Sequence, residues 1–186
     1  MRVAVFFATR EGQTRRIALR IANDLRAKAA DVDLFDVRNE APIDWLSYGT
    51  ACVAASVHAG HHEGEMIDFV RKHRAELERL SAAFISVTLS EAGAEDTART
   101  DADRARAAAD VQHMLDVFVT ETGWKPERCL PVAGALAYSK YNIFVRFIMK
   151  RIARRAGAPT DPSRDYEFTN WPALDRFVEG LTASRH

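Results

Sequence analysis

The fold of this chain is decided by residues 1–14, which read MRVAVFFATREGQT. Residues 1–8 form an almost unbroken apolar run, which predicts a buried strand. Residues 9–14 contribute hydroxyl, charged and glycine residues, and a helical pattern begins at Thr14. The first backbone N–H groups of such a helix have no partner within it, and the helix dipole favours negative charge there. The sequence therefore predicts an anion-binding loop between a strand and a helix.

The composition of this loop restricts the kind of anion. It lacks the lysine of the G-x-x-x-x-G-K-[ST] motif, and no G-x-G-x-x-G follows the strand. Nucleoside triphosphates and dinucleotides are therefore disfavoured, and a single terminal phosphate, such as that of FMN, fits better. The alternative is a plain turn in which Thr14 caps the helix. The residues predicted to hold the phosphate end are Thr9, Arg10, Glu11, Gly12, Gln13 and Thr14.

Four further apolar runs alternate with helical patterns. The strands are predicted at residues 32–37, 51–57, 82–89 and 130–137. The helices are predicted at residues 14–30, 65–80 and 103–122. Continuous apolar strands between helices predict an α/β fold with a doubly wound, five-stranded parallel sheet and helices on both faces. With 186 residues, of which 47% are hydrophobic, we expect a single domain over residues 1–186.

Charge and composition exclude several classes of function. The 26 basic residues equal the 26 acidic ones, so nothing draws the whole chain to nucleic acid. The chain enters a strand at once rather than a signal peptide, and no run of about 18 apolar residues could span a membrane. We therefore expect a cytoplasmic protein with reduced thiols, in which Cys52 and Cys129 are small core residues.

In a doubly wound sheet the ligand lies at the carboxyl ends of the strands, so the loops after residues 51–57 and 82–89 join the predicted site. The first contributes Ser56, Val57, His58, Ala59, Gly60 and His61. The second contributes Ser86, Val87, Thr88 and Leu89. We also expect the His62 side chain to cover part of a flat ligand ring. The three histidines of the first loop lack a second cluster of ligands at metal-binding spacing, so we predict no metal.

Several of these motifs together resemble a known family. They are residues 9–14, 60–61, 83–87, 124–129, 133–136 and 138–150. The chain resembles flavodoxins in general and, over nearly its whole length, the menaquinone-dependent protoporphyrinogen oxidases of flavodoxin-like fold. Carrier flavodoxins usually have a threonine where Glu11 stands, whereas the oxidases have an acid. The resemblance therefore implies a flavodoxin-like fold, FMN as cofactor and an oxidase.

An inserted amphipathic, basic segment at about residues 138–157 distinguishes the chain from a simple electron carrier. As a helix over residues 141–156 it has one apolar and one basic face. The apolar face holds Phe144, Val145, Ile148, Met149 and Ile152, and the basic face holds Arg146, Lys150 and Arg154. Such a helix can bind an anionic membrane surface or place a quinone near the flavin. The alternative is packing on its own domain or on a second subunit of a homo-oligomer.

The resemblance implies FMN-dependent oxidation of protoporphyrinogen IX to protoporphyrin IX in haem biosynthesis. Menaquinone or another quinone would accept the electrons, and the protein would be peripherally associated with the inner face of the cell membrane. The alternatives are an FMN electron-transfer protein without a tetrapyrrole substrate and an FMN-dependent quinone reductase. No catalytic residue is identified by the sequence. The candidate proton acceptors are His58, His61 and a basic residue of residues 138–150, and Lys140 and Arg146 are candidate partners of the substrate propionates.

Overall fold

A parallel sheet forms the centre of the molecule. The computed structural model describes residues 2–39, 42–136, 161 and 163–183. The sheet is built from β1 (Arg2–Ala8), β2 (Asp31–Asp36), β3 (Thr50–His58), β5 (Ser81–Thr88) and β6 (Arg128–Ala133). These strands lie in the order β2-β1-β3-β5-β6, and each neighbouring pair is parallel. The predicted doubly wound α/β sheet is confirmed, and its strand order reverses between β1 and β3.

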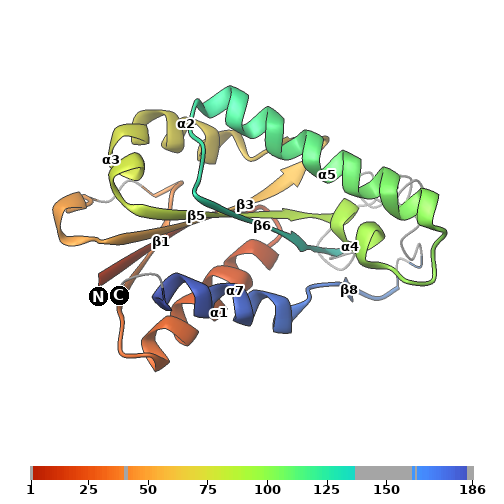
Figure 1. Cartoon of the computed structure of the whole chain (residues 1–186), viewed down its shortest axis with the longest axis horizontal. Helices are drawn as coiled ribbons and strands as arrows, with labels where there is room; N and C mark the ends of the chain where they lie inside the picture. Colours follow the sequence, from red (N-terminus) through yellow and green to blue (C-terminus); the bar gives the residue numbers. More distant parts are fainter. Residues whose placement is uncertain (1, 40–41, 137–160, 162, 184–186) are drawn as a thin grey trace.

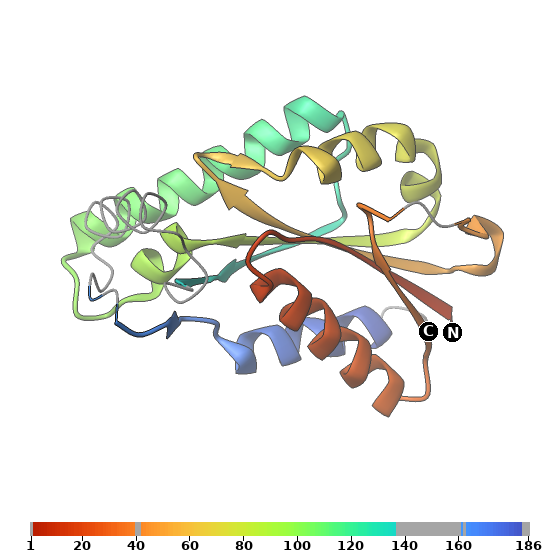
Figure 2. The same cartoon turned by 180° about the vertical axis from the view of Figure 1, so that it is seen from behind.

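Helices cover both faces of the sheet (Figure 1). One face carries α1 (Gln13–Ala27) and α7 (Trp171–Ala183), and the other carries α2 (Gly64–Lys72), α3 (Arg74–Arg79) and α5 (Asp101–Thr122). The view from behind shows the same two layers (Figure 2). The remaining elements are η1 (Trp45–Ser47), β4 (His61–His62), α4 (Leu89–Glu95), β7 (Ala135–Leu136) and β8 (Tyr166–Glu167).

Each face of the sheet has its own apolar core. On the face covered by α1 and α7, Ile17 and Leu25 of α1 pack with Leu174 of α7 against the strands. On the opposite face, Phe84 of β5 stacks on Phe118 of α5, with the ring centroids 4.1 Å apart and the ring planes at 5° to each other. Because both faces are covered, the strands are apolar on both sides, which is why they appear in the sequence as continuous rather than alternating runs.

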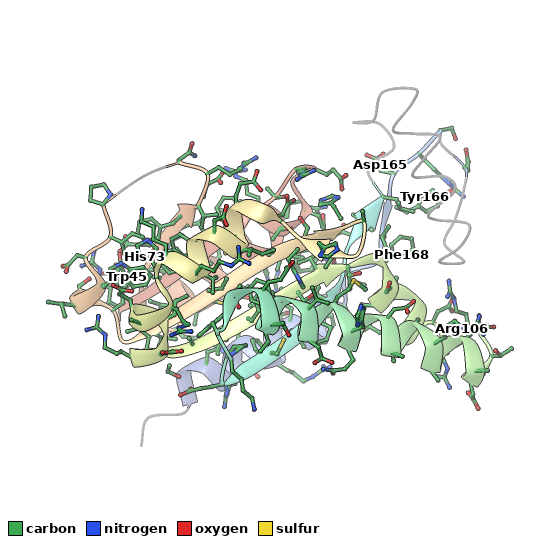
Figure 3. The ribbon with its side chains drawn as sticks, turned by 90° about the horizontal axis from the view of Figure 1, so that it is seen from above. Trp45, His73, Arg106, Asp165, Tyr166 and Phe168 are labelled. Carbon is green, nitrogen blue, oxygen red and sulfur yellow. The ribbon has the colours of Figure 1, made fainter. Side chains whose placement is uncertain are left out.

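The two ends of the molecule are marked by aromatic pairs (Figure 3). Trp45 and His73 lie side by side at one end, with ring centroids 5.0 Å apart. Tyr166 and Phe168 lie at the other end, beyond the carboxyl ends of the strands, with centroids 6.4 Å apart. Trp45 also packs against Phe6 and Phe69 of the core.

Several boundaries differ from the sequence-based predictions. The helix predicted at 65–80 is interrupted at His73, and the strand predicted at 130–137 starts at Arg128 and ends at Ala133. The helix α7 was not predicted at all. Cys52 is buried as expected, but Cys129 is exposed, so its prediction as a core residue is wrong: β6 is an edge strand and one of its faces is open there.

The inserted segment of residues 138–157, with its predicted helix at 141–156, lies outside the described residues. Its described flanks are β7 and β8, which pair antiparallel with each other. In the part of the chain that the structure describes, no helix is both long enough and apolar enough to cross a membrane.

Candidate FMN site

The loop of residues 9–14 follows β1, at the point where the strand order reverses. Thr9 is buried, and its Oγ1 accepts a hydrogen bond of 2.9 Å from the backbone N–H of Gly12. Gly12 has φ 99°, in the left-handed region, and it occupies the N-cap position of α1. A side chain at this φ would be strained, so the tight turn requires the glycine. The loop is therefore closed upon itself immediately before the helix begins.

Thr14, in the first turn of α1, is the most informative residue of this loop. Its side chain is fully buried, and Oγ1 has no hydrogen-bond partner among the described residues. The first hydrogen bond of the helix joins Arg16 N–H to Gly12 O. The backbone N–H groups before Arg16 therefore have no carbonyl partner within the helix. Thr14 does not cap the helix, because Gly12 holds that position. A buried hydroxyl without a partner costs about 1–3 kcal/mol, which a bound anion would remove.

Two adjoining hollows open at this end of the sheet. The smaller, which we call the inner hollow, has a volume of about 50 Å³. Its lining is Thr9, Glu11, Gln13, Thr14, Ser56, Val57, His58, Val87, Thr88, Leu89, Gly134 and Ala135. Ten of these residues were predicted from the sequence, because the loops that follow parallel strands meet at one edge. Gly134 and Ala135 were missed because they lie within the strand predicted at residues 130–137, whereas β6 ends at Ala133 and leaves them at that same edge.

The larger, outer hollow has a volume of about 510 Å³ and shares Val57, His58, Thr88 and Leu89 with the inner one. Its remaining lining is Ala59, Gly60, His61, Ser90, Asp110, His113, Met114 and Val117. Ala59 and Gly60 have φ 51° and 87°, so the backbone turns sharply between β3 and β4. The outer hollow thus lies between the loop after β3 and the start of α4, with α5 at its side. Its apolar and imidazole side chains suit a flat heteroaromatic ring.

Glu63 was not predicted and lies behind these loops. Its side chain is only 2% exposed. The carboxylate accepts from Ser56 Oγ at 2.9 Å, lies 3.1 Å from His58 Nε2 and accepts from Arg10 Nε at 2.8 Å. Burial alone would raise the pKa of Glu63, but the contact with His58 and the hydrogen bond from Ser56 outweigh it and lower the pKa. In the sequence this acid resembles a solvated residue before a helix, so no pattern marked it.

His62 and Ser86 form a separate buried pair. His62 Nε2 and Ser86 Oγ lie 2.9 Å apart, and the imidazole packs against Phe84 and Phe118. Burial lowers the pKa of His62 to about 4. The expectation that His62 covers a ring is wrong, because its side chain points into the core. Ser86 likewise lines neither hollow, although it was among the predicted ligand contacts.

The other predicted residues hold the loop in place. Arg10 turns toward Glu63 and does not line the inner hollow. Gln13 Nε2 donates to Glu167 Oε1 and to Thr169 Oγ1, both at 2.8 Å, and Thr169 Oγ1 donates to Ala133 O. The loop after β1 is thereby tied to β8 and to the end of β6.

Among the described residues, no group of three or more metal-ligating side chains converges on a point that could hold a metal ion.

Comparison with known proteins identifies the family. A family model described as a flavodoxin domain matches residues 4–163. The chain belongs to the flavodoxin family. The structures of Bacillus cereus flavodoxin 1, with a TM-score of 0.55 at 15% identity, and of a flavodoxin from Streptococcus pneumoniae, at 0.53 and 17%, each match over the whole length of both chains. These likenesses confirm the flavodoxin-like fold.

Curated relatives match over nearly the full length. Escherichia coli K12 protoporphyrinogen IX dehydrogenase [quinone] is 30% identical over 181 residues, which are 97% of this chain and 94% of that protein. A protein of the same name from Leishmania major is 29% identical over 96% of this chain and 74% of its own length. The resemblance inferred from the loop motifs is thus confirmed by whole-chain similarity.

Family membership implies FMN as the cofactor, and the described residues fit it. The free hydroxyl of Thr14 and the N–H groups at the start of α1 match a phosphate, while the outer hollow offers space for the flavin ring. The lining of the inner hollow connects these two places. No lysine is needed, because backbone N–H groups and the helix dipole supply the attraction for the phosphate.

The Thr14 hydroxyl can be tested by an isosteric change. We expect Thr14→Val to weaken FMN binding about tenfold, since one hydrogen bond to a charged group is lost. The FMN-free protein should keep its stability or gain some, because the hydroxyl that lacks a partner is removed. Titration of FMN fluorescence and urea unfolding measure the two effects. Unchanged FMN affinity would place the phosphate elsewhere.

The buried His62 predicts a pH dependence of stability. The unfolded chain takes up a proton at this residue near pH 6.5, whereas the folded chain does so only near pH 4. The unfolded state therefore binds more protons in this window, and stability falls as the pH drops from 6.5 to 4, by on the order of 3 kcal/mol. We expect this step in urea unfolding of the wild type and not in His62→Gln. An equal pH dependence in both proteins would refute the assignment.

Proposed function

We propose that this protein uses FMN to oxidise protoporphyrinogen IX to protoporphyrin IX in haem biosynthesis and passes the electrons to a quinone. The observation that carries the proposal is the match over 97% of the chain to the Escherichia coli protein named protoporphyrinogen IX dehydrogenase [quinone]. The protein of the same name from Leishmania major, which matches 96% of this chain, supports the same proposal.

The side chains at the site divide the work of binding and orientation. FMN, when bound, supplies the acceptance of electrons from one molecule and their transfer to another. Thr14 and the N–H groups at the start of α1 would hold the phosphate, and residues 57–60 line the outer hollow. Leu89 and Met114 contribute apolar side chains to the lining of that hollow.

Oxidation of the tetrapyrrole releases protons, so a proton acceptor is required. Of the two histidines predicted for this role, His58 is engaged by the buried carboxylate of Glu63. His61 is 63% exposed, lines the outer hollow and lies 3.6 Å from Glu121 Oε1 through its Nδ1. His61 is therefore the better candidate for a group that exchanges protons with solvent. The propionate partners proposed from the sequence, Lys140 and Arg146, lie outside the described residues.

The proposal includes peripheral attachment to the inner face of the cell membrane through the helix predicted at residues 141–156. This attachment is supported by where the flanks of the segment lie. Ala135 of β7 lines the inner hollow, and β7 pairs with β8, so the chain leaves and re-enters the described fold beside the cofactor site. A quinone dissolved in a bilayer would be met most directly at this edge of the molecule.

The central test is anaerobic reduction of the FMN-loaded protein by protoporphyrinogen IX, followed by addition of menaquinone. We expect the flavin absorbance to bleach with the tetrapyrrole and to recover with the quinone. A bound flavin that ignores the tetrapyrrole but is reoxidised by quinone would favour a quinone reductase or an electron carrier instead. Reduction by protoporphyrinogen without recovery in quinone would refute the proposed acceptor.

Membrane attachment is tested separately by sedimentation with liposomes that contain anionic lipid. We expect the wild type to sediment and the double variant Phe144→Asp/Ile148→Asp to stay in solution with FMN bound. A control is Leu46→Asp, which places one aspartate at an apolar position that is 87% exposed in η1. This control should sediment like the wild type. A wild type that never sediments contradicts the attachment.

A further inference from the structure

Glu63 occupies an unusual position for a carboxylate. It is the N-cap residue of α2, where an acidic side chain normally accepts from the first turn of its own helix, yet it makes no such cap hydrogen bond. The side chain turns away from α2 and lies almost wholly buried between two loops. A buried charge is costly unless it is fully paired, so its partners define what it does.

The partners of Glu63 come from both loops that bound the cofactor site. Arg10 belongs to the loop after β1, whereas Ser56 and His58 belong to the end of β3. The backbone adds a further link, because Glu63 N–H donates to Ser56 O at 3.1 Å. These contacts span 53 residues of sequence between Arg10 and Glu63. The Glu63 carboxylate therefore links the two loops to each other.

The loop that Glu63 holds has a strained backbone. Ala59 has φ 51°, which is uncommon for a residue with a Cβ, and Gly60 follows with φ 87°. Such conformations persist only where the surroundings determine them. The hairpin from β3 to β4 is short, and Glu63 follows it directly and joins its two sides through Ser56 and His58. The carboxylate is thus placed to fix the wall that separates the inner and outer hollows.

We propose that Glu63 is a positioning residue that clamps the phosphate loop to the flavin-ring loop and holds the His58 imidazole at the wall common to both hollows. This inference rests on the FMN site proposed above. Glu63 itself lines neither hollow, so it acts through Arg10, Ser56 and His58 rather than by touching the cofactor.

The contact with Glu63 also affects the protonation of His58, which lines both hollows. The close contact with the Glu63 carboxylate raises the pKa of His58, against an opposing effect of burial, and Glu11 raises it further while Arg10 lowers it. From the neighbouring elements, His61 of β4 and Asp110 and His113 of α5 line the same outer hollow. A protonated His58 beside the ring favours the negative charge that a flavin gains on reduction.

The main experiment compares Glu63→Gln with Glu65→Gln, a matched loss of negative charge on the exposed side of α2. We expect Glu63→Gln to weaken FMN binding about tenfold or more, because a buried charge-assisted network is broken. In the FMN-free protein, the His58 titration followed by NMR should shift to lower pH. Glu65→Gln should change neither quantity. A Glu63→Gln variant with wild-type FMN affinity and an unshifted His58 titration would overturn the proposal.

A surface variant keeps the test sound if Glu63→Gln does not fold. Arg10→Gln removes one end of the clamp from a side chain that is 61% exposed, and Arg15→Gln removes an equal charge without contacting Glu63. We expect Arg10→Gln to weaken FMN binding more than Arg15→Gln does and to raise the pH at which His58 titrates. Equal effects of the two variants would refute the clamp. If the wild type bound no FMN, the proposed function would fail, and the His58 titrations would still decide on the clamp.

Discussion

The site depends on one constraint: where β1 passes into α1, a hydroxyl group is buried without a hydrogen-bond partner among the described residues. Thr9 satisfies one N–H of the turn, at Gly12, but the Thr14 hydroxyl is left without a partner among the described residues. The Thr14 side chain is fully buried, so water has little access to this hydroxyl. An anion at the start of α1 relieves this deficit, and every other part of the site is arranged around that position.

The loops around the anion position are held by polar contacts rather than by apolar packing. Gln13 connects the phosphate loop to Glu167 and Thr169, and Glu63 connects it to the end of β3. Both sets of contacts join segments that are far apart in the sequence. The orientation of the two hollows is therefore determined before any ligand arrives, which reduces the entropic cost of binding.

The sequence predicted the sheet and most of the lining of the inner hollow, because apolar strands and the convergence of their carboxyl ends are local and topological properties. It did not predict Glu63, since an acid before a helix is usually solvated and only the tertiary fold buries it. His62 was misassigned for a related reason: β4 pairs with β3, and this pairing turns alternate side chains of the short strand toward Phe84 and Phe118. Cys129 was misassigned because a strand pattern does not show that the strand lies at the edge.

A crystal structure of the FMN complex tests the central claim most directly. A third hollow, of about 680 Å³ and lined in part by Phe35, Phe69 and His73, does not include the 9–14 loop and offers FMN an alternative place. Our account predicts the phosphate within hydrogen-bonding distance of Thr14 Oγ1, with the flavin ring between the loop after β3 and the start of α4. A phosphate that leaves Thr14 Oγ1 without a partner, or a flavin bound beside His73, would contradict it.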